Sequence, residues 1–487
     1  MSLPMATPSN SEELIALPMR PRVPVKVPSD PAIRTFVVVG AILLHVLMGV
    51  LFSKVSVLSM VHALAVGVLA FWCAATDRSL MRLALAAAYI AGSEGLWRIT
   101  GATLIWEYGK YTMAASMIFA LVLHGRIKPY WPPMVYLALL IPGTLLTFTM
   151  VDLEKARQLV SFDLSGPISL AVSVFFFSKV KLTQRQVAKM LLCYIIPTVM
   201  IVALIVLGLA AQEEVVFRKS SLAAASGGFG PNQISAALGL ASLCCFLVAT
   251  NRSVPLLLRI FFGLAILAFA SQSALTFSRC GLFYFAGGFL LSTMVMMRNP
   301  QMAIQLGLLL AVLAALIYFF VFPWLDAFTG GAMSDRFTSG EMSKRDTIVA
   351  MDLKIFQENA FLGIGVGRAK EVRQAMEHRA SSHTEYTRLL AEHGFLGVLA
   401  IVMLFWMGFI HFWRPRTVEG RALAAGMVAY TLMYMMGNGM RQVLPGLTFG
   451  IAACTVLPAT SKRARGAGIP KNVTVLTPPD EPTMQGA

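Results

Sequence analysis

A histidine in a polar stretch between apolar runs is the first candidate for acid–base chemistry. The stretch covers residues 381–397 and leads from the longest polar interruption back into an apolar run. Ser382 is followed three residues later by Glu385, a capping-box spacing that predicts His383 in the first turn of a helix. A helix N-terminus disfavours imidazolium, so we expect a neutral ring that can accept a proton. Tyr386 follows on the same face and is predicted to line the same pocket. The alternative is that His383 is only a second polar capping residue.

A second group of candidates consists of arginines in segments that the topology below places on the outer side of a membrane. The positive-inside rule depletes arginine there, so its presence implies a function. The simplest function is to hold a phosphate or an acidic glycan by charge-assisted, often bidentate contacts. Surface solvation is the alternative, and it suits Arg373 and Arg379 better than Arg279. The residues are Arg279, Arg336, Arg345, Arg368, Arg373, Arg379 and Arg441.

Four charged residues fall inside apolar runs. Glu94 and Arg98 are spaced i,i+4 near the outer end of one run, and Glu107 and Lys110 are spaced i,i+3 near the start of the next. Charges within a membrane are costly and usually functional, so Arg98 and Lys110 are candidate substrate-binding residues. The signs balance, however, so an ion-pair cluster that only joins neighbouring helices is an equal alternative.

The composition predicts an all-α, polytopic integral membrane protein. Of the 487 residues, 57% are hydrophobic and 13% are charged, with a mean hydropathy of +0.71. A soluble domain carries about 25% charged residues. The apolar runs are continuous rather than alternating, which favours helices over a barrel. About 14 runs are near the ~20 residues that a spanning helix needs. They are residues 33–53, 56–75, 80–99, 103–123, 132–151, 165–180, 190–210, 232–249, 258–276, 281–297, 303–323, 394–413, 422–439 and 442–459.

The domain organisation follows from these runs and the basic loops between them. Every loop that the alternation places inside is basic, which predicts that both chain ends are cytoplasmic. We expect a disordered N-terminus at 1–30, eleven spans at 31–323, a large periplasmic loop at 324–393, three spans at 394–460 and a disordered tail at 461–487. No cleavable signal peptide is expected in the polar, proline-rich N-terminus.

The long loop is predicted to be ordered rather than a plain linker. Apolar residues between 345 and 360 lie broadly on one side of an amphipathic helix. Three glycines within residues 363–367 predict a turn, and residues 370–379 predict a short helix. These pieces could lie flat on the membrane surface and roof a cavity. A further glycine turn at residues 226–233 is a candidate anion or sugar site, although a plain helix entry explains it equally well.

Several classes of function find no support in the sequence. The net charge of +16 comes from short loops beside the spans, so we expect no nucleic-acid partner. The six cysteines lie in or beside apolar runs without metal-ligand spacing. No metal-binding motif is present, and the glycines at 363–367 lack the strand that a nucleotide fingerprint requires. We therefore predict a site with no metal and no cofactor.

In combination, these features resemble the O-antigen ligase/polymerase superfamily of bacterial envelope glycosyltransferases. The resemblance covers about residues 160–440 and depends on the order of four short blocks. Three are residues 165–167, 228–232 and 278–281. The fourth is the long loop, with Arg345, residues 358–367, residues 383–386 and residues 390–394.

The resemblance implies a GT-C-like glycosyltransferase of the bacterial inner membrane with its active site facing the periplasm, among membrane lipids. Such proteins move a glycan from an undecaprenyl-diphosphate carrier to an acceptor hydroxyl. The acceptor is lipid A–core for a ligase and another carrier-linked glycan for a polymerase. By position, His383 is the expected catalytic base, Arg279 and Arg345 the expected diphosphate clamps, and Arg336 a further clamp.

Two other functions stay open at this stage. A transporter or flippase of lipid-linked glycans would also need many spans, but it usually shows internal repeats and broken helices. We detect no repeat. A protein O-oligosaccharyltransferase would use the same donor with a Ser or Thr acceptor. Fold similarity alone does not separate these functions.

Overall fold

The chain folds almost entirely into helices, as the composition predicts. The computed structural model describes residues 31–458 except 103, 213–216, 218–220, 339–344 and 376–382. The predicted disordered ends lie outside the described residues. The helices are α1 (Pro31–Lys54), α2 (Ser56–Thr76), α3 (Met81–Ile99), α4 (Tyr108–Leu123), α5 (Trp131–Met150), α6 (Leu153–Phe177), α7 (Gln184–Ala210), η1 (Ala224–Ser226), α8 (Pro231–Thr250), α9 (Leu256–Leu275), α10 (Cys280–Met296), α11 (Pro300–Leu316), η2 (Ile317–Val321), α12 (Phe322–Phe328), α13 (Ala332–Thr338), α14 (Arg345–Glu358), α15 (Ala369–Ala375), α16 (Glu385–Trp413), α17 (Val418–Asn438) and α18 (Leu444–Ala453).

Each of the fourteen predicted runs overlaps a helix. Among the described residues, nine helices are long and apolar enough to cross a membrane, and three further apolar helices are shorter. This confirms an all-α polytopic membrane protein, whereas the number of fourteen spans and their direction stay predictions. One boundary is wrong: residues 153–164, which were expected to form a loop, are the first turns of α6. Their polar residues therefore extend a helix beyond its apolar part.

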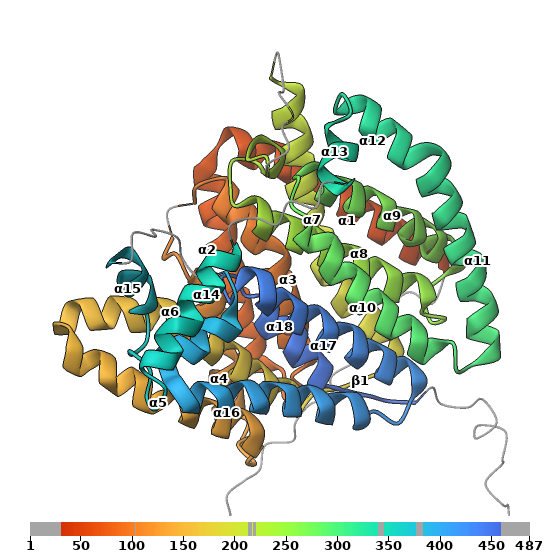
Figure 1. The fold of residues 1–487 in the computed structure, drawn as a ribbon. Coiled ribbons are helices and arrows are strands. Elements are labelled where there is room, and N and C mark those ends of the chain that lie inside the picture. Colours follow the sequence, from red (N-terminus) through yellow and green to blue (C-terminus); the bar gives the residue numbers. More distant parts are fainter. Residues whose placement is uncertain are drawn as a thin grey trace, which may run out of the picture.

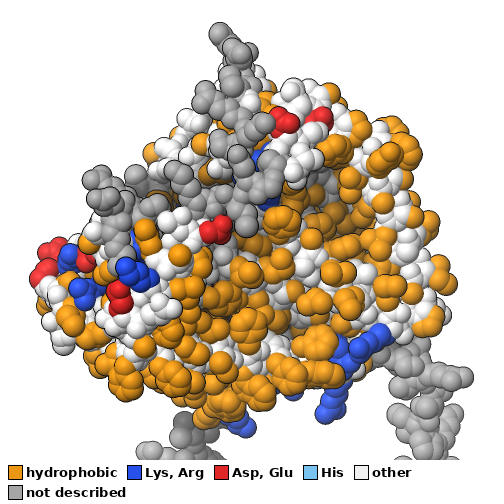
Figure 2. Space-filling view, viewed as in Figure 1, with side chains coloured by type: hydrophobic (Ala, Val, Ile, Leu, Met, Phe, Trp, Pro, Cys, Tyr) orange, Lys and Arg blue, Asp and Glu red, His pale blue; other side chains and the backbone are white. Residues whose placement is uncertain are grey.

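The helices pack around α8. In its most apolar stretch, 89% of the residues are buried, against 11% in α1 and in the continuous helix Pro300–Phe328. Figure 1 shows α11 and α12 along one edge of the bundle, outside α9 and α10. Figure 2 shows that hydrophobic side chains cover most of the visible face and that charged side chains gather near its margins. A surface of this kind suits contact with lipid.

Glycines bring α8 and α10 into backbone contact. A Cβ at Gly239 would lie 2.2 Å from the carbonyl oxygen of Gly281, and one at Gly281 would lie 1.9 Å from that of Ser235. Small residues permit such close approach between membrane helices. The contact places two of the sequence blocks together, because the Ser278 hydroxyl donates to Asn232 Oδ1 at 2.7 Å.

A kink in α16 joins the long loop to the bundle. Gly394 has φ 58° and ψ −134°, so the carbonyls before it are turned out of the helix. The loop amides of Ile364 and Gly365 donate to the carbonyls of Ala391 and Glu392 at 3.0 and 3.1 Å. Gly363, Gly365 and Gly367 all have positive φ, which confirms the predicted turn. The loop is thus docked onto α16.

The predicted amphipathic helix is confirmed as α14. Ile348, Asp352 and Ile355 are buried at i, i+4 and i+7 on the side that contacts α16. Leu353, which was assigned to the same side, is exposed. The short helix predicted at 370–379 is described as α15, and its residues after 375 lie outside the described part of the chain.

Two features at the other end of the bundle were not predicted. β1 (Lys181–Leu182) and β2 (Thr455–Val456) form a parallel pair that ties the start of α7 to the segment after α18. A capping box at Thr183 and Gln186 begins α7, with Thr183 N donating to Gln186 Oε1 at 2.8 Å.

A chain of aromatic and histidine side chains links the first three helices. Trp97 Nε1 donates to His62 Nδ1 at 3.0 Å, and His62 Nε2 lies 3.0 Å from the Tyr89 hydroxyl. The same hydroxyl lies 2.9 Å from His45 Nε2. With both imidazole rings neutral, His62 donates to the Tyr89 hydroxyl and that hydroxyl donates to His45. One set of histidine tautomers therefore gives every hydrogen bond in this row a donor and an acceptor.

Candidate functional site

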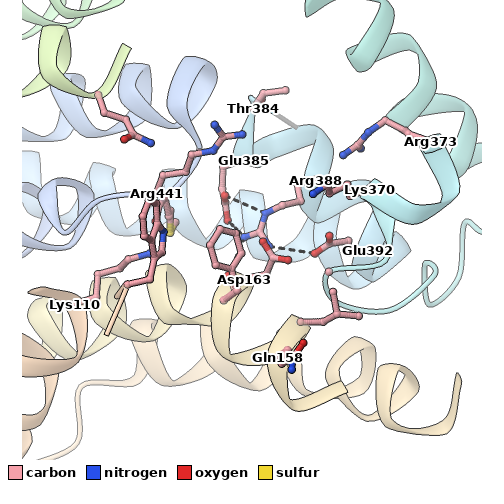
Figure 3. Close-up of a pocket in the computed structure, with 17 residues that line it drawn as sticks. Lys110, Gln158, Asp163, Lys370, Arg373, Thr384, Glu385, Arg388, Glu392 and Arg441 are labelled. Carbon is pink, nitrogen blue, oxygen red and sulfur yellow. Dashed lines mark hydrogen bonds and ion pairs between the residues drawn. The ribbon is translucent and has the colours of Figure 1, made fainter. Parts of the chain in front are cut away.

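A cavity of about 530 Å³ lies where the loop-docked end of α16 meets α4, α6, α15 and the connection between α17 and α18. Its lining residues include five cations and three carboxylates (Figure 3). The cations are Lys110, Lys370, Arg373, Arg388 and Arg441, and the carboxylates are Asp163, Glu385 and Glu392. Such a concentration of charge beside apolar helices makes the cavity the candidate functional site.

Arg388 is the centre of the acidic part of the cavity. Its Nη1 lies 3.2 Å from both Asp163 Oδ1 and Glu392 Oε2, and its Nε lies 3.2 Å from Glu385 Oε2. Figure 3 shows the three carboxylates converging on this one guanidinium. The group therefore carries two more negative than positive formal charges, and it offers carboxylate oxygens to hydroxyl donors.

The Arg388 group was missed from the sequence. Glu385, Arg388 and Glu392 have the i,i+3 and i,i+4 spacing of helical ion pairs, so part of the signal is local. Asp163 lies far away in the chain, on the part of α6 that was expected to be a loop. Only the fold brings Asp163 of α6 within reach of Arg388 of α16.

The four charges predicted within the apolar runs form one buried cluster. Arg98 Nη2 lies 2.8 Å from Glu94 Oε1 and 3.8 Å from Glu107 Oε2, and Lys110 Nζ lies 2.5 Å from Glu107 Oε2. Glu94 Oε2 also accepts from the amide of Val443 at 2.9 Å. The cluster joins α3, α4 and the start of α18, and Lys110 is the member that lines the cavity.

Lys110 is held in place from three sides. Besides Glu107, its Nζ donates to Ser165 Oγ at 3.0 Å and to the carbonyl of Met440 at 2.9 Å. Arg98 does not line the cavity, but its guanidinium lies over the ring of Trp106, which does, with 4.8 Å to the ring centroid. Both residues proposed from this cluster are thus tied to the wall of the site.

The roof of the cavity is fixed by a second buried ion pair. Arg373 of α15 pairs with Asp352 of α14, and the Thr387 hydroxyl donates to Asp352 Oδ2 at 2.8 Å. These contacts connect α14 and α15 to the first turn of α16. Lys370, one turn before Arg373, lines the cavity with an exposed side chain.

His383 precedes the first residue of α16 and is not among the described lining residues of the cavity. The helix begins at Glu385, and Thr384, with φ −109° and ψ 129°, is its N-cap. The prediction of a first-turn position is therefore wrong, since the helix starts two residues later, and Glu385 pairs with Arg388. Ser382 lies outside the described residues. Thr384 lines the cavity, and the neighbouring His383 is half-buried.

Tyr386 makes its described contacts with α17 and with Phe405. Its hydroxyl donates to the carbonyl of Leu432 at 2.9 Å, and its ring stacks on Phe405. It does not belong to the described lining of the cavity. These contacts attach the start of α16 to α17 and to Phe405, further along α16.

Two of the predicted clamp arginines lie in a separate group. Arg279 Nη2 donates to the carbonyl of Arg336, and Arg336 Nε donates to the carbonyl of Phe277 at 3.1 Å. The pair joins α13 to the turn before α10, and neither residue lines the described cavity. The side chain of Arg345 lies outside the described part of the chain, as does Arg379.

Residues 264–402 match a family model described as O-antigen ligase. The match confirms the resemblance to the O-antigen ligase/polymerase superfamily. It runs from within α9 to within α16, so it contains the docked loop, His383, Arg388 and most of the cavity's charged residues. A comparison with curated proteins found no match.

Proposed function

We propose, from the O-antigen ligase match and the charged cavity together, that this chain transfers a glycan from a lipid diphosphate to an acceptor hydroxyl. The O-antigen ligase/polymerase type of function follows in general from the family. The undecaprenyl-diphosphate donor, the lipid A–core or carrier-linked glycan acceptor, the periplasmic site and metal independence belong to the proposal.

The observation that carries the proposal is the pairing of two kinds of group in one cavity. Cations lie on both sides of the carboxylates that surround Arg388 (Figure 3). Arginine and lysine bind phosphate oxygens by charge-assisted hydrogen bonds. Carboxylates accept hydrogen bonds from hydroxyls, which a sugar supplies in number. A glycan joined to a diphosphate needs both kinds of partner.

We assign the diphosphate to the side of the cavity that holds Arg441 and Lys110. Lys110 is fixed by Glu107, Ser165 and the carbonyl of Met440, so its charge is preorganised. As the bond between the anomeric carbon and the diphosphate oxygen breaks, negative charge develops on the leaving group. Fixed cations stabilise that charge without reorganising. Lys370 supplies a further cation on the opposite side.

His383 is assigned as the base, because it directly precedes the cavity-lining Thr384 in the chain. It would take the proton of the acceptor hydroxyl while the hydroxyl oxygen forms its bond to the anomeric carbon. Its neighbour Thr384 lines the cavity, and the Arg388 ion pairs hold the helix that follows. Four further residues stay predicted substrate-binding residues but receive no role in this assignment: Arg279, Arg336, Arg345 and Tyr386.

A glycolipid profile of a deletion strain tests the proposal. The strain is complemented with the wild-type gene, with His383→Ala or with the control Arg298→Ala. Arg298 is an exposed residue just after the C-terminal end of α10. We expect wild type and control to restore long glycan and His383→Ala to fail at equal protein level. Restoration by His383→Ala would contradict the assigned base and favour a transporter.

The same profile separates the two enzyme classes. Accumulation of long carrier-linked polymer, with none on lipid A–core, identifies a ligase. Accumulation of single repeats identifies a polymerase. A third outcome is normal lipid A–core glycan and normal carrier-linked glycan, together with loss of glycan from secreted proteins. This outcome identifies a protein O-oligosaccharyltransferase.

A further inference from the structure

A second charged hollow lies at the end of the bundle opposite the cavity. Three helices connect the two places. Lys110 and Leu123 both belong to α4, Asp163 of α6 precedes the C-cap Ser178, and Glu385 begins α16, whose C-cap is Arg414. The hollow has a volume of about 780 Å³. It is lined by Arg78, Leu123, His124, Gly125, Arg126, Lys128, Ser178, Lys179, Lys181, Arg414 and Thr455.

The charge of this hollow is of one sign. Six of the lining residues that the structure describes are lysine or arginine, and none of those described is Asp or Glu. The positive-inside rule explains basic loops in general, but it does not require that they converge. Here four separate connections, around Arg78, Lys128, Lys179 and Arg414, meet at one hollow. The charged cavity at the other end differs, because carboxylates balance most of its cations.

Lys179 shows the effect of this unbalanced charge. Its Nζ donates to the carbonyl of Lys128 at 2.7 Å and lies 4.9 Å from the ring centroid of Phe175. Partial burial lowers the pKa of Lys179, and the positive charges of Arg414 and Lys128 lower it further. A bound anion would relieve this repulsion.

The walls of the hollow are built by backbone pairing rather than by loose loops. Lys181 pairs with Thr455 in the parallel β1–β2 ladder, which fixes two lining residues to each other. His124 Nε2 lies 2.8 Å from the carbonyl of Ala74. The Arg414 guanidinium lies 5.8 Å from the ring centroid of Tyr130. The cationic groups are therefore held near one another before any ligand arrives.

Large exposed apolar side chains lie next to lining residues of the hollow in the chain, and we call them the apolar rim. Leu123 lines the hollow itself, and its neighbours in the chain include Ile127 and Trp131. Trp413 precedes Arg414, and it is 55% exposed. Tryptophan and basic residues together mark the boundary between lipid tails and headgroups. The hollow thus opens where a phospholipid headgroup lies.

We propose that this basic hollow binds the phosphate of an anionic phospholipid. Basic pockets between membrane helices recognise such headgroups by charge, and lysine and arginine supply the hydrogen bonds. The site is separate from the charged cavity and does not depend on the reaction proposed there. Phosphate is the shared chemistry of lipid and soluble anions, and the apolar rim favours the lipid.

Native mass spectrometry of the full chain tests this proposal. The protein is purified and mixed with phosphatidylglycerol or phosphatidylcholine, and the bound lipid is titrated. We expect a clear preference for phosphatidylglycerol. Replacing two cations with Lys179→Gln and Arg414→Gln should weaken the binding of phosphatidylglycerol about 10- to 30-fold, because each basic residue near an anionic headgroup contributes about 1 kcal/mol. The control pair Arg252→Gln and Arg298→Gln, also at this end of the bundle, should bind as wild type.

Three outcomes would overturn the proposal. The first is equal binding of the two lipids by wild type. The second is equal loss in the hollow and control variants. The third is inorganic phosphate binding in detergent as tightly as phosphatidylglycerol, which would make the hollow a site for a soluble anion. The unfolding temperature of each variant in phosphatidylcholine shows whether the variant is folded. If Lys179→Gln with Arg414→Gln is misfolded, the exposed pair Arg78→Gln and Lys128→Gln is used in its place.

Discussion

At the scale of single residues, Arg388 explains why the cavity can hold three carboxylates. All three approach its guanidinium, and the side chains of Glu385 and Glu392 are almost fully buried. The sequence pattern pointed to His383, Arg279, Arg336 and Arg345, because histidine and outer arginines are conspicuous in an apolar chain. It did not point to Arg388, because the role of that residue depends on Asp163, which lies on a different helix.

Removal of Arg388 should destabilise the protein strongly. In Arg388→Ala three carboxylates lose their common partner, and breaking a buried ion pair costs about 3–5 kcal/mol. Thermal unfolding in detergent measures the loss, with Arg298→Ala as the exposed control. Adding Glu392→Gln should restore part of the stability, since it removes one uncompensated charge. If Arg388→Ala unfolds at the wild-type temperature, the central role of this guanidinium is refuted.

At the scale of the elements, the sequence predicted the positions of the helices well but not where α6 and α16 begin. The apolar runs located nearly every membrane helix, since burial in lipid requires long apolar segments. The polar start of α6 was read as a loop, because composition cannot tell an exposed helix turn from a connection. The start of α16 was placed at Ser382 on a local capping pattern, whereas the helix begins at Glu385 with Thr384 as its N-cap.

The kink at Gly394 should be sensitive to any side chain. Its φ of 58° with ψ −134° favours glycine, and a Cβ would lie 2.6 Å from the carbonyl oxygen of Ala360. Gly394→Ala should therefore cost at least about 1–3 kcal/mol and shift the segment that carries His383, lowering transfer. Thermal unfolding and transfer rates are compared with Gly208→Ala, where a Cβ meets nothing within 4 Å. Equal behaviour of the two variants would contradict the docking role of the kink.

The Tyr89 hydroxyl should stabilise the contact between α1, α2 and α3. Tyr89→Phe removes its hydrogen bonds to His45 and His62, and such bonds between membrane helices contribute about 0.6–1.7 kcal/mol each. We expect a lower unfolding temperature with unchanged transfer at low temperature. Tyr318→Phe is the matched control, because Tyr318 is 74% exposed. A loss no larger than that of the control would count against the chain of hydrogen bonds.

At the scale of the whole molecule, charge is divided between two ends of an apolar bundle. One end holds the cavity with both signs of charge, and the other holds the hollow with cations alone. The positive-inside rule then predicts an orientation with the hollow in the cytoplasm and the cavity outside. The sequence could suggest this division from its loops, but the convergence of distant loops into two sites required the fold.

Labelling from the two sides of the membrane tests this orientation. A cysteine at Lys370→Cys should react with a membrane-impermeant maleimide in intact cells, whereas one at Lys128→Cys should react only after permeabilisation. Both positions are exposed. The wild-type chain is the background control, because none of its six cysteines is exposed. Labelling of both variants from the same side would refute the division of the molecule into an outer and an inner end.

Transfer by the purified protein tests the central claim most directly. The protein is reconstituted with a polyprenyl-diphosphate-linked glycan and a lipid-linked acceptor, and product is followed with time. General-base catalysis contributes about 10²- to 10⁴-fold, so His383→Ala should slow transfer by that factor while Arg298→Ala transfers as wild type. Arg441→Ala should slow it as well, through weaker stabilisation of the diphosphate. Wild-type rates in both His383→Ala and Arg441→Ala would contradict the assignment of the charged cavity as the site of glycan transfer.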